Sequence, residues 1–449
     1  MNTLLYLRPR GAQSRAKRVF GVQWDPTSSS PTLTRTDDAV GMTAAVGGDT
    51  NLVTNQFDAA PIFGELVPVT DSLGNTFVRI PKFYIKKESA ANLRSIRISK
   101  TQYPGFYLPA CFYDFTNGVE LPYFDYGKHL GSLNGSVLAS VPDVFPLHTK
   151  TIVEFRTYAC ANNASGRAGY QQLDVHAYDV LSALFTVEFA TLNSQAILQG
   201  YTAGDYSAAR TATAAETGAN RIILANANAE VFRVGQTISI GTSLGGGQVA
   251  TNRVVTQIAV VDGSNKALVF DGAAANIAIG NIAYNVARKT GFSSGIAATS
   301  GYITANDGKY PCTYRGIESP YGDVWQFVDG VNINEYQAWV ALNAADYASN
   351  VFASPYVQLG YANVGADGYV KEMGHDSNSP FAEFATSVTG GSATTYYSDY
   401  YYRNTGQRIA HVGGSWSHGS HAGLRYWYLA SASSSAPVSV GGRLLKKAL

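Results

Sequence analysis

The chain has 449 residues, of which 45% are hydrophobic and only 14% are charged, and its formal net charge is +1. This length allows roughly two to four domains. A charged fraction well below the ~25% of average soluble domains, with abundant Gly, Ser, Thr and Tyr, favours β-rich and loop-rich structure. A net charge so close to zero provides no general field for nucleic acid or an anionic membrane, so neither partner is expected.

Residues 1–18 have a short apolar run followed by five basic residues, the reverse of the order in a secretory signal. Pro9 and Gly11 discourage regular structure there, and we predict an N-terminal arm. Short β-type runs broken by turn residues follow, which indicates a β-rich N-terminal region over 19–75. Because no stretch approaches the ~20 apolar residues that span a bilayer, membrane insertion is not expected.

Two segments predict the secondary structure of the main domain. "TFVRIPKFYIKKE" (Thr76–Glu88) alternates apolar and polar residues as a half-buried strand does, and Pro81 suggests that it starts or edges a sheet. Ala177–Leu198 carries a broad apolar stripe and predicts a long helix that packs across a sheet. These elements lead us to expect an α+β fold, with a main domain formed by residues 76–203 and 290–449.

Between those two parts, residues 204–289 change in character. Strand-like runs alternate with Gly, Asn and Asp turns, and aromatic residues are few. We predict an inserted all-β domain. Its sequence leaves open whether it is a spacer or a second binding module.

Candidates for catalysis have simpler structural alternatives. "GTSLG" (Gly241–Gly245) matches a nucleophile elbow around Ser243, but no convincing helix follows it, and a β-turn is favoured. Glu188 lies within the helix stripe, where pairing with an arginine or backbone donors is favoured over a role as a general acid. Three cysteines without CxxC spacing argue against a disulfide framework or a structural zinc site.

The C-terminal segment contains three histidines, of which His418 and His421 have HxxH spacing and His411 is nearby. No acidic residue lies between Gln407 and the end of the sequence, so no local carboxylate could support a metal ligand. We predict no metal and no cofactor. The Tyr-dense block over residues 396–402 is interpreted as core or subunit contact rather than ligand contact.

The same segment mixes Tyr, Ser, His and Arg between two double glycines, without helix or strand periodicity. Tyrosine offers contact area at low entropy cost and serine offers adaptable hydrogen bonds, as in binding loops on a rigid framework. An ordinary Gly/Ser-rich loop is the alternative. The candidate ligand-binding residues are Ser417, His418, Ser420, His421, Leu424, Arg425, Tyr426, Tyr428, Ala430, Ser431 and Ser433.

Three motifs, in chain order, are "FYIKKE" (Phe83–Glu88), "SPYGDVWQFVDG" (Ser319–Gly330) and "HVGGSWSHG…VGGRLLK" (His411–Lys446). They resemble the framework of formylglycine-generating-enzyme-like proteins, which implies a C-type lectin-like domain. Enzymes of that family carry two cysteines soon after the GGS turn, and alignment on that turn places His418 and Gly423 there. The resemblance therefore does not imply catalysis, and we predict that the protein is not an enzyme.

A second resemblance is to phage tail proteins and the variable proteins of diversity-generating retroelements. It rests on "GVQWD" (Gly21–Asp25), "TRTDDA" (Thr34–Ala39), "IPKFY" (Ile80–Tyr84), the helix-bearing segment Phe155–Gln195 and the terminal GGSW segment. Diversified positions in such proteins cannot become Lys, Glu, Gln or Met, and none of these occurs from Ser415 to Ser439. The resemblance implies a homotrimer in the virion tail, made in the host cytoplasm.

Two functions are compatible with this resemblance. The first is a tail-tip or tail-fibre protein that attaches the phage to a host surface receptor, protein or glycan, through its C-terminal face. The alternative is a structural tail or baseplate component in which the same face contacts another virion tail protein. An enzyme of the formylglycine-generating or glycan-cleaving type is disfavoured.

Overall fold

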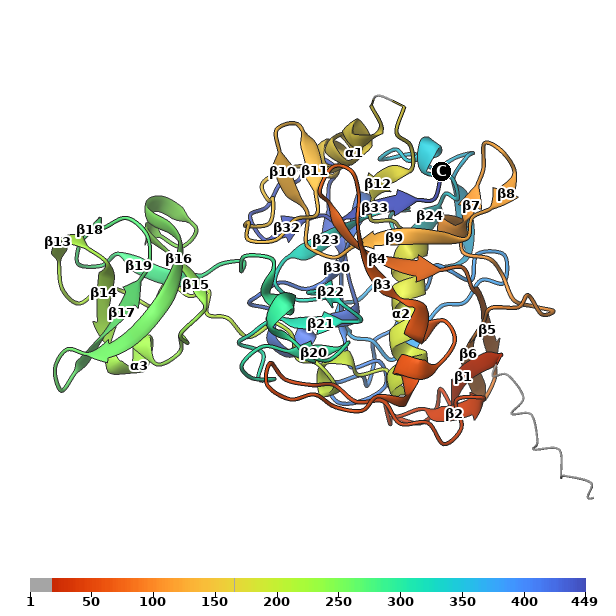
Figure 1. Cartoon of the computed structure of the whole chain (residues 1–449), viewed down its shortest axis with the longest axis horizontal. Coiled ribbons are helices and arrows are strands. Elements are labelled where there is room, and N and C mark those ends of the chain that lie inside the picture. The colour runs from red at the N-terminus through yellow and green to blue at the C-terminus, as the bar shows by residue number, and fades with distance from the viewer. Residues whose placement is uncertain (1–17, 165) are drawn as a thin grey trace, which may run out of the picture.

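The computed structural model describes residues 18–164 and 166–449. Figure 1 shows a large body and a smaller side lobe, which we define as residues 206–284. The predicted N-terminal arm falls outside the described residues except for Arg18. The predicted ranges 19–75, 76–203 and 290–449 all contribute to the body, and their boundaries stay a prediction.

The side lobe is built around a five-stranded antiparallel sheet with its own hydrophobic cluster, centred on Ile222, Ile238 and Leu268. The sheet has the order β14 (Arg221–Ala225), β17 (Asn265–Phe270), β16 (Gly246–Val260), β15 (Thr237–Ser243), β19 (Ile282–Asn285). A second ladder joins β13 (Glu216–Ala219) to β18 (Ala275–Ile277), and α3 (Asn226–Ala229) is a single turn. Ser243 pairs with Gly246 in the β15–β16 hairpin, which confirms the turn interpretation.

The chain enters and leaves the side lobe at adjacent points. The backbone N–H of Asn285 donates to the carbonyl of Asp205 at 2.7 Å, and the Asp205 N–H donates to the Asn285 side chain at 2.7 Å. Trp416 of the body packs in one hydrophobic cluster with Tyr201 and Ala287, which flank these points. The chain therefore passes between body and lobe through a narrow double connection seated on Trp416, and the body also bonds to the lobe through Lys309 and Tyr310.

Two sheets form the N-terminal part of the body. One has the order β2 (Thr34–Asp37), β1 (Val19–Trp24), β6 (Leu93–Ser99), β5 (Tyr84–Ala90). The other has the order β12 (Tyr170–Gln172), β33 (Leu444–Lys447), β9 (Tyr123–Gly127), β4 (Thr76–Pro81), β3 (Val67–Thr70). The single strand predicted over Thr76–Glu88 is thus wrong, because the chain passes from β4 in one sheet to β5 in the other after Pro81.

The largest sheet belongs to the C-terminal part. Its order is β25 (Val357–Ala362), β24 (Gln337–Val340), β23 (Trp325–Asn334), β30 (Gln407–Gly413), β31 (Gly423–Ser431), β29 (Tyr400–Arg403), β26 (Gly368–Tyr369), with β32 (Val440–Gly441) also paired to β23. Most neighbours are antiparallel, but β29 runs parallel to β31 and β32 runs parallel to β23. This sheet carries most of the terminal segment.

Small sheets and short helices fill the rest of the body. The sheets are β7 (Tyr113–Asp114) with β8 (Val119–Glu120), β10 (Ser132–Asn134) with β11 (Val137–Ala139), β20 (Gly301–Tyr302) with β21 (Cys312–Tyr314) and β22 (Ile317–Glu318), and β27 (Glu372–Met373) with β28 (Ala385–Ser387). The helices are α1 (Ile152–Cys160), η1 (Gln56–Ala59), η2 (Phe63–Glu65), η3 (Ala110–Phe112), η4 (Ala161–Asn163), η5 (Ser194–Ala196), η6 (Phe292–Gly295), η7 (Ala344–Asp346) and η8 (Gly419–His421).

The long helix α2 (Val175–Phe189) runs through the body and is buried at nearly every position (Figure 1). Asp174 caps its N-terminus by accepting from the Ala177 N–H, and Ala190 ends it in the left-handed conformation. The helix predicted over Ala177–Leu198 therefore ends nine residues earlier than expected, because residue 190 breaks the backbone hydrogen-bond pattern while the apolar residues continue.

Glu188 on this helix is fully buried against Arg315. The Arg315 Nη2 and Nε donate to its two carboxylate oxygens at 2.6 and 2.9 Å, and Asn55 and Tyr314 donate the remaining bonds. This pairing confirms the structural interpretation of Glu188, since its hydrogen-bonding capacity is used within the core.

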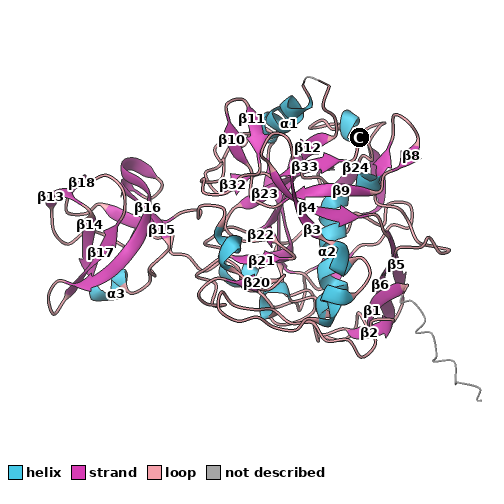
Figure 2. Ribbon diagram, in the orientation of Figure 1, coloured by secondary structure: helices cyan, strands magenta, loops and turns pink. Residues whose placement is uncertain are grey.

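The predicted α+β class, with a C-type lectin-like domain, is wrong. The protein is β-rich, with 38% strand and 13% helix arranged as many small sheets and a half-barrel (Figure 2). The α+β prediction rests on one strong helix pattern. Apart from α1 and α2, however, the helices within the described residues are only about one turn long. Gly-, Ser- and Tyr-rich segments that lack periodicity form the short strands instead.

Candidate functional site

The candidate site lies on the large sheet, where register places tyrosines of two strands side by side. In the parallel pair of β29 and β31, Tyr402 lies opposite Tyr428, and Tyr401 lies opposite Trp427. Side chains alternate along a strand, so Tyr400, Tyr402, Tyr426 and Tyr428 share one face while Tyr401 and Trp427 point to the other. Trp427 packs on Phe384 and on Tyr178 of α2, which makes that other face part of the core.

The tyrosine side of the sheet forms a continuous group of ring contacts, which we call the aromatic face. Tyr428 stacks between Tyr402 at 5.0 Å and His411 at 5.5 Å, with interplanar angles of 20° and 10°. Tyr400 stacks on His421 at 4.1 Å. The members are Trp325, Tyr369, Tyr400, Tyr402, His411, His418, His421, Tyr426 and Tyr428.

The aromatic face has a buried floor and an accessible upper layer. Trp325, His411 and Tyr426 are 2–3% exposed and form the floor. Tyr402 is 39% exposed. Tyr428 and the other rings of the upper layer are partly exposed. Stacking on a packed floor fixes the upper rings at little further cost in side-chain entropy, so they offer a preorganised contact surface.

Burial also keeps the aromatic face electrically neutral. Desolvation lowers the pKa of His411 to about 3 and the pKa of His418 to about 4, and it lowers the pKa of His421. The histidines are therefore uncharged at pH 7. The Ser415 N–H and hydroxyl contact the His418 Nδ1 at 3.1 and 3.0 Å. The face can offer ring surface, hydroxyl groups and imidazole nitrogens, but no strong charge.

The structure brings only part of the predicted set to the surface. Ser417 and Ser420 are exposed, and the hydroxyl of Ser420 contacts that of Tyr369 at 2.8 Å. His418, His421, Tyr428, Ala430, Ser431 and Ser433 are partly exposed. The accessible members lie in the turn before η8, on η8, on β31 and in the loop after it.

Three predicted residues are buried and do not offer their side chains to a ligand. Leu424 is 0% exposed, and Tyr426 lies in the floor. Arg425 is 8% exposed, and its guanidinium donates to Thr186 of α2. As direct ligand contacts these three are corrected to supporting residues, because both sides of β31 are covered, one by α2 and the other by the upper rings.

Tyr400 and Tyr402, which the sequence predicts as core or subunit contacts, belong to the aromatic face, and so does Trp325, which is not among the predicted site residues. The alternation of Tyr400 and Tyr402 around Tyr401 was a period-two signal for one shared face. This alternation does not reveal that β29 pairs with β31, because β30 lies between the two strands in the chain. Tyr369, from β26, had no signal of its own.

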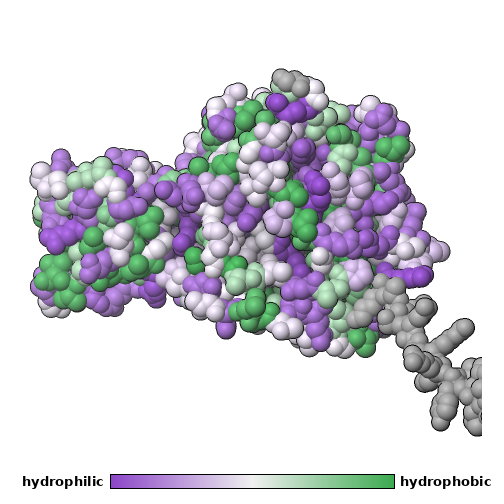
Figure 3. Space-filling model, in the orientation of Figure 1, coloured by the Kyte–Doolittle hydropathy of each residue, from purple (hydrophilic) through white to green (hydrophobic). Residues whose placement is uncertain are grey.

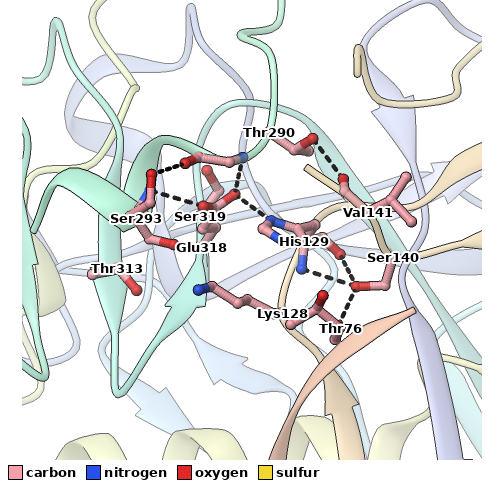
Figure 4. A network of polar contacts seen from close by, with 12 residues as sticks. Thr76, Lys128, His129, Ser140, Val141, Thr290, Ser293, Thr313, Glu318 and Ser319 are labelled. Carbon is pink, nitrogen blue, oxygen red and sulfur yellow. Dashed lines mark hydrogen bonds and ion pairs between the residues drawn. The ribbon is translucent and has the colours of Figure 1, made fainter. Parts of the chain in front are cut away.

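A polar cluster lies within the body, close to the point where the chain returns from the side lobe (Figure 4). His129 Nδ1 lies 2.8 Å from Glu318 Oε2, and the backbone N–H groups of Gly291 and Ser293 donate to the same carboxylate at 2.9 and 2.8 Å. Although burial alone would raise the pKa of Glu318, these bonds lower it. Ser140 approaches the backbone N–H of His129 and not its ring, so the cluster is an anchor and not a catalytic triad.

Within residues 18–164 and 166–449, no group of three or more His, Cys, Asp or Glu side chains is placed to hold a metal ion. Over the same ranges, no helix combines the length and apolar character needed to cross a bilayer.

Comparison with known proteins found no family model that matches the chain and no curated protein that matches it.

Proposed function

We propose that this protein is a non-catalytic phage tail-tip or tail-fibre protein that attaches the virion to a host surface receptor through the aromatic face. The observation that carries the proposal is a neutral, accessible group of stacked Tyr and His rings on a buried Trp325 floor. Large rigid aromatic side chains are the residues that most often dominate binding energy in protein interfaces. The assignment to a phage tail rests on the sequence resemblance.

The chemistry of the aromatic face suits a receptor that presents apolar surface edged by hydroxyl or amide groups, as both proteins and glycans do. Tyrosine supplies an apolar ring and a hydroxyl at low entropy cost. Three copies of the face in a homotrimer would raise the avidity of a weak single contact by orders of magnitude. Other tail proteins of the virion would hold the opposite end of the assembly.

The test is binding of fluorescently labelled, oligomer-checked protein to candidate host cells. Tyr402→Ala and Tyr428→Ala remove accessible rings of the upper layer, whereas Tyr426→Ala would remove a ring of the floor itself. We expect the double variant to lose at least ~10-fold in affinity, the scale of a truncated interface tyrosine. Tyr402→Phe keeps the ring and removes the hydroxyl, so it shows which of the two contributes to binding.

Tyr103→Ala is the matched control, because Tyr103 is a partly exposed tyrosine in the loop after β6. Equal binding by the wild type and the double variant would contradict the assignment to the aromatic face. Absence of cell binding by a correctly assembled wild type, with binding to a purified tail protein instead, would favour the structural tail or baseplate role.

A further inference from the structure

A cleft of about 290 Å³ separates the side lobe from the body. On the lobe side it is lined by residues of β15, β16 and β19 and by Tyr206, and on the body side by Phe145, His148 and Trp416. Its volume is close to the ~300 Å³ lower end of small-molecule sites in proteins. The side lobe stands beside the body in Figure 3, and the only parts of the chain that connect them are the two segments seated on Trp416.

Aromatic rings form the walls of the cleft. Tyr206 packs edge-on against Tyr284 at 5.5 Å and against Trp416 at 6.2 Å, so lobe and body contribute to one ring cluster. Gly245 is required beside it, since a Cβ there would lie 2.5 Å from the Tyr206 hydroxyl. The rings are therefore held in place by the lobe and by the body together.

Neutral polar groups complete the lining. The Gln248 side-chain amide donates to the Tyr284 hydroxyl at 2.9 Å, and the side chains of Thr251 and Asn252 lie on the same strand, β16. The indole N–H of Trp416 is buried and has no hydrogen-bond partner among the described residues.

The residues that line the cleft are uncharged. None of the described residues that line it is Asp, Glu, Lys or Arg. Burial lowers the pKa of His148, so its imidazole is neutral at pH 7. A phosphate, carboxylate or ammonium group would lose its hydration there without gaining a counter-charge.

We propose that this cleft binds a neutral saccharide unit. A pyranose has an apolar C–H face that packs on a partly exposed ring such as Tyr206, and a rim of hydroxyls that bond to amides such as Gln248 and Asn252. The site is separate from the aromatic face and does not depend on the function proposed for it. It makes the side lobe a binding module and not a spacer alone.

The test follows the protein by ¹⁹F NMR after incorporation of 5-fluorotryptophan, which gives one resonance for each of the five tryptophans. Trp416→Phe identifies the resonance of Trp416. The probes are the methyl glycosides of glucose, galactose, mannose and N-acetylglucosamine, with glucuronate as an anionic counterpart. We expect at least one neutral glycoside, and not glucuronate, to shift the Trp416 resonance saturably.

Gln248→Ala should weaken that binding about fivefold, the scale of one lost neutral hydrogen bond, and Thr251→Trp should abolish it by filling the cleft. Gln257→Ala is the matched control, an exposed glutamine on β16 outside the lining. Tyr402→Ala should bind glycosides as the wild type does, which separates this site from the aromatic face. The proposal is overturned if no neutral glycoside shifts the Trp416 resonance, if glucuronate binds as well, or if Thr251→Trp binds like the wild type.

Discussion

Asp399 lies directly beneath the aromatic face and is the basis of a quantitative prediction. It precedes Tyr400 at the start of β29, is 1% exposed, and accepts a hydrogen bond from the Arg425 N–H at 2.7 Å. Desolvation raises the pKa of its carboxyl to about 8, against the opposing effects of that bond and of the Arg425 charge. We predict that Asp399→Asn stabilises the protein at alkaline pH.

The sign and size follow from proton linkage. The pKa of an aspartate in an unfolded chain is ~3.9, so between pH ~4 and pH ~8 the folded state binds more protons than the unfolded state. The contribution of Asp399 to stability is therefore greatest below pH ~4 and is lost as the pH rises through the folded-state pKa of about 8. At ~1.4 kcal/mol for each pH unit, the loss reaches about 6 kcal/mol, and an asparagine in the same place avoids it.

The assay is urea unfolding of the wild type and Asp399→Asn at each pH from 5 to 9. The difference in unfolding free energy should grow by ~1.4 kcal/mol for each pH unit up to pH 8 and then level off. Asp346→Asn, at an exposed aspartate, is the control and should change stability little at any pH. A difference for Asp399→Asn that does not vary with pH would refute the linkage argument.

Three further predictions concern the core, the terminal turn and the side lobe. Arg315→Met should cost ~3–5 kcal/mol in urea unfolding, because it leaves the buried Glu188 carboxylate without its partner; a cost under ~1 kcal/mol would contradict this. Gly414→Ala should lower the unfolding free energy by at least ~1–2 kcal/mol, since φ is +82° and a Cβ would lie 2.8 Å from that of Ala422; an unchanged thermal midpoint would argue against it. Replacing residues 206–284 with two glycines should leave the body folded, because its entry and exit points are hydrogen-bonded neighbours, and retention of its near-UV circular dichroism is the check.

Local structure follows from the sequence most directly where one residue type decides it. The turn at Ser243 and the partner of Glu188 were inferred from single positions and are confirmed. Helix α2 was found, but its end was not, because the apolar pattern continues past residue 190 although the backbone turns there.

The terminal strand could not be predicted from periodicity. β31 is buried on both faces for most of its length, so Leu424, Arg425 and Tyr426 all point into packed surroundings and no alternation appears in the sequence. The sequence alone does not show that Arg425 is buried and bonds to Thr186, because an exposed arginine at this position would be written in the same way. The aromatic face itself depends on the pairing of β29 with β31, which is a tertiary relationship.

The position of β33 determines when this protein can finish folding. Leu444–Lys447 pairs with β12 on one side and β9 on the other, in the middle of a sheet that begins at Val67. Until residue 447 has been synthesised, those two strands each present an unpaired edge, which is a template for association with other chains. A chain that lacks Leu444–Lys447 would thus carry two unpaired strand edges, so β33 is what closes this sheet.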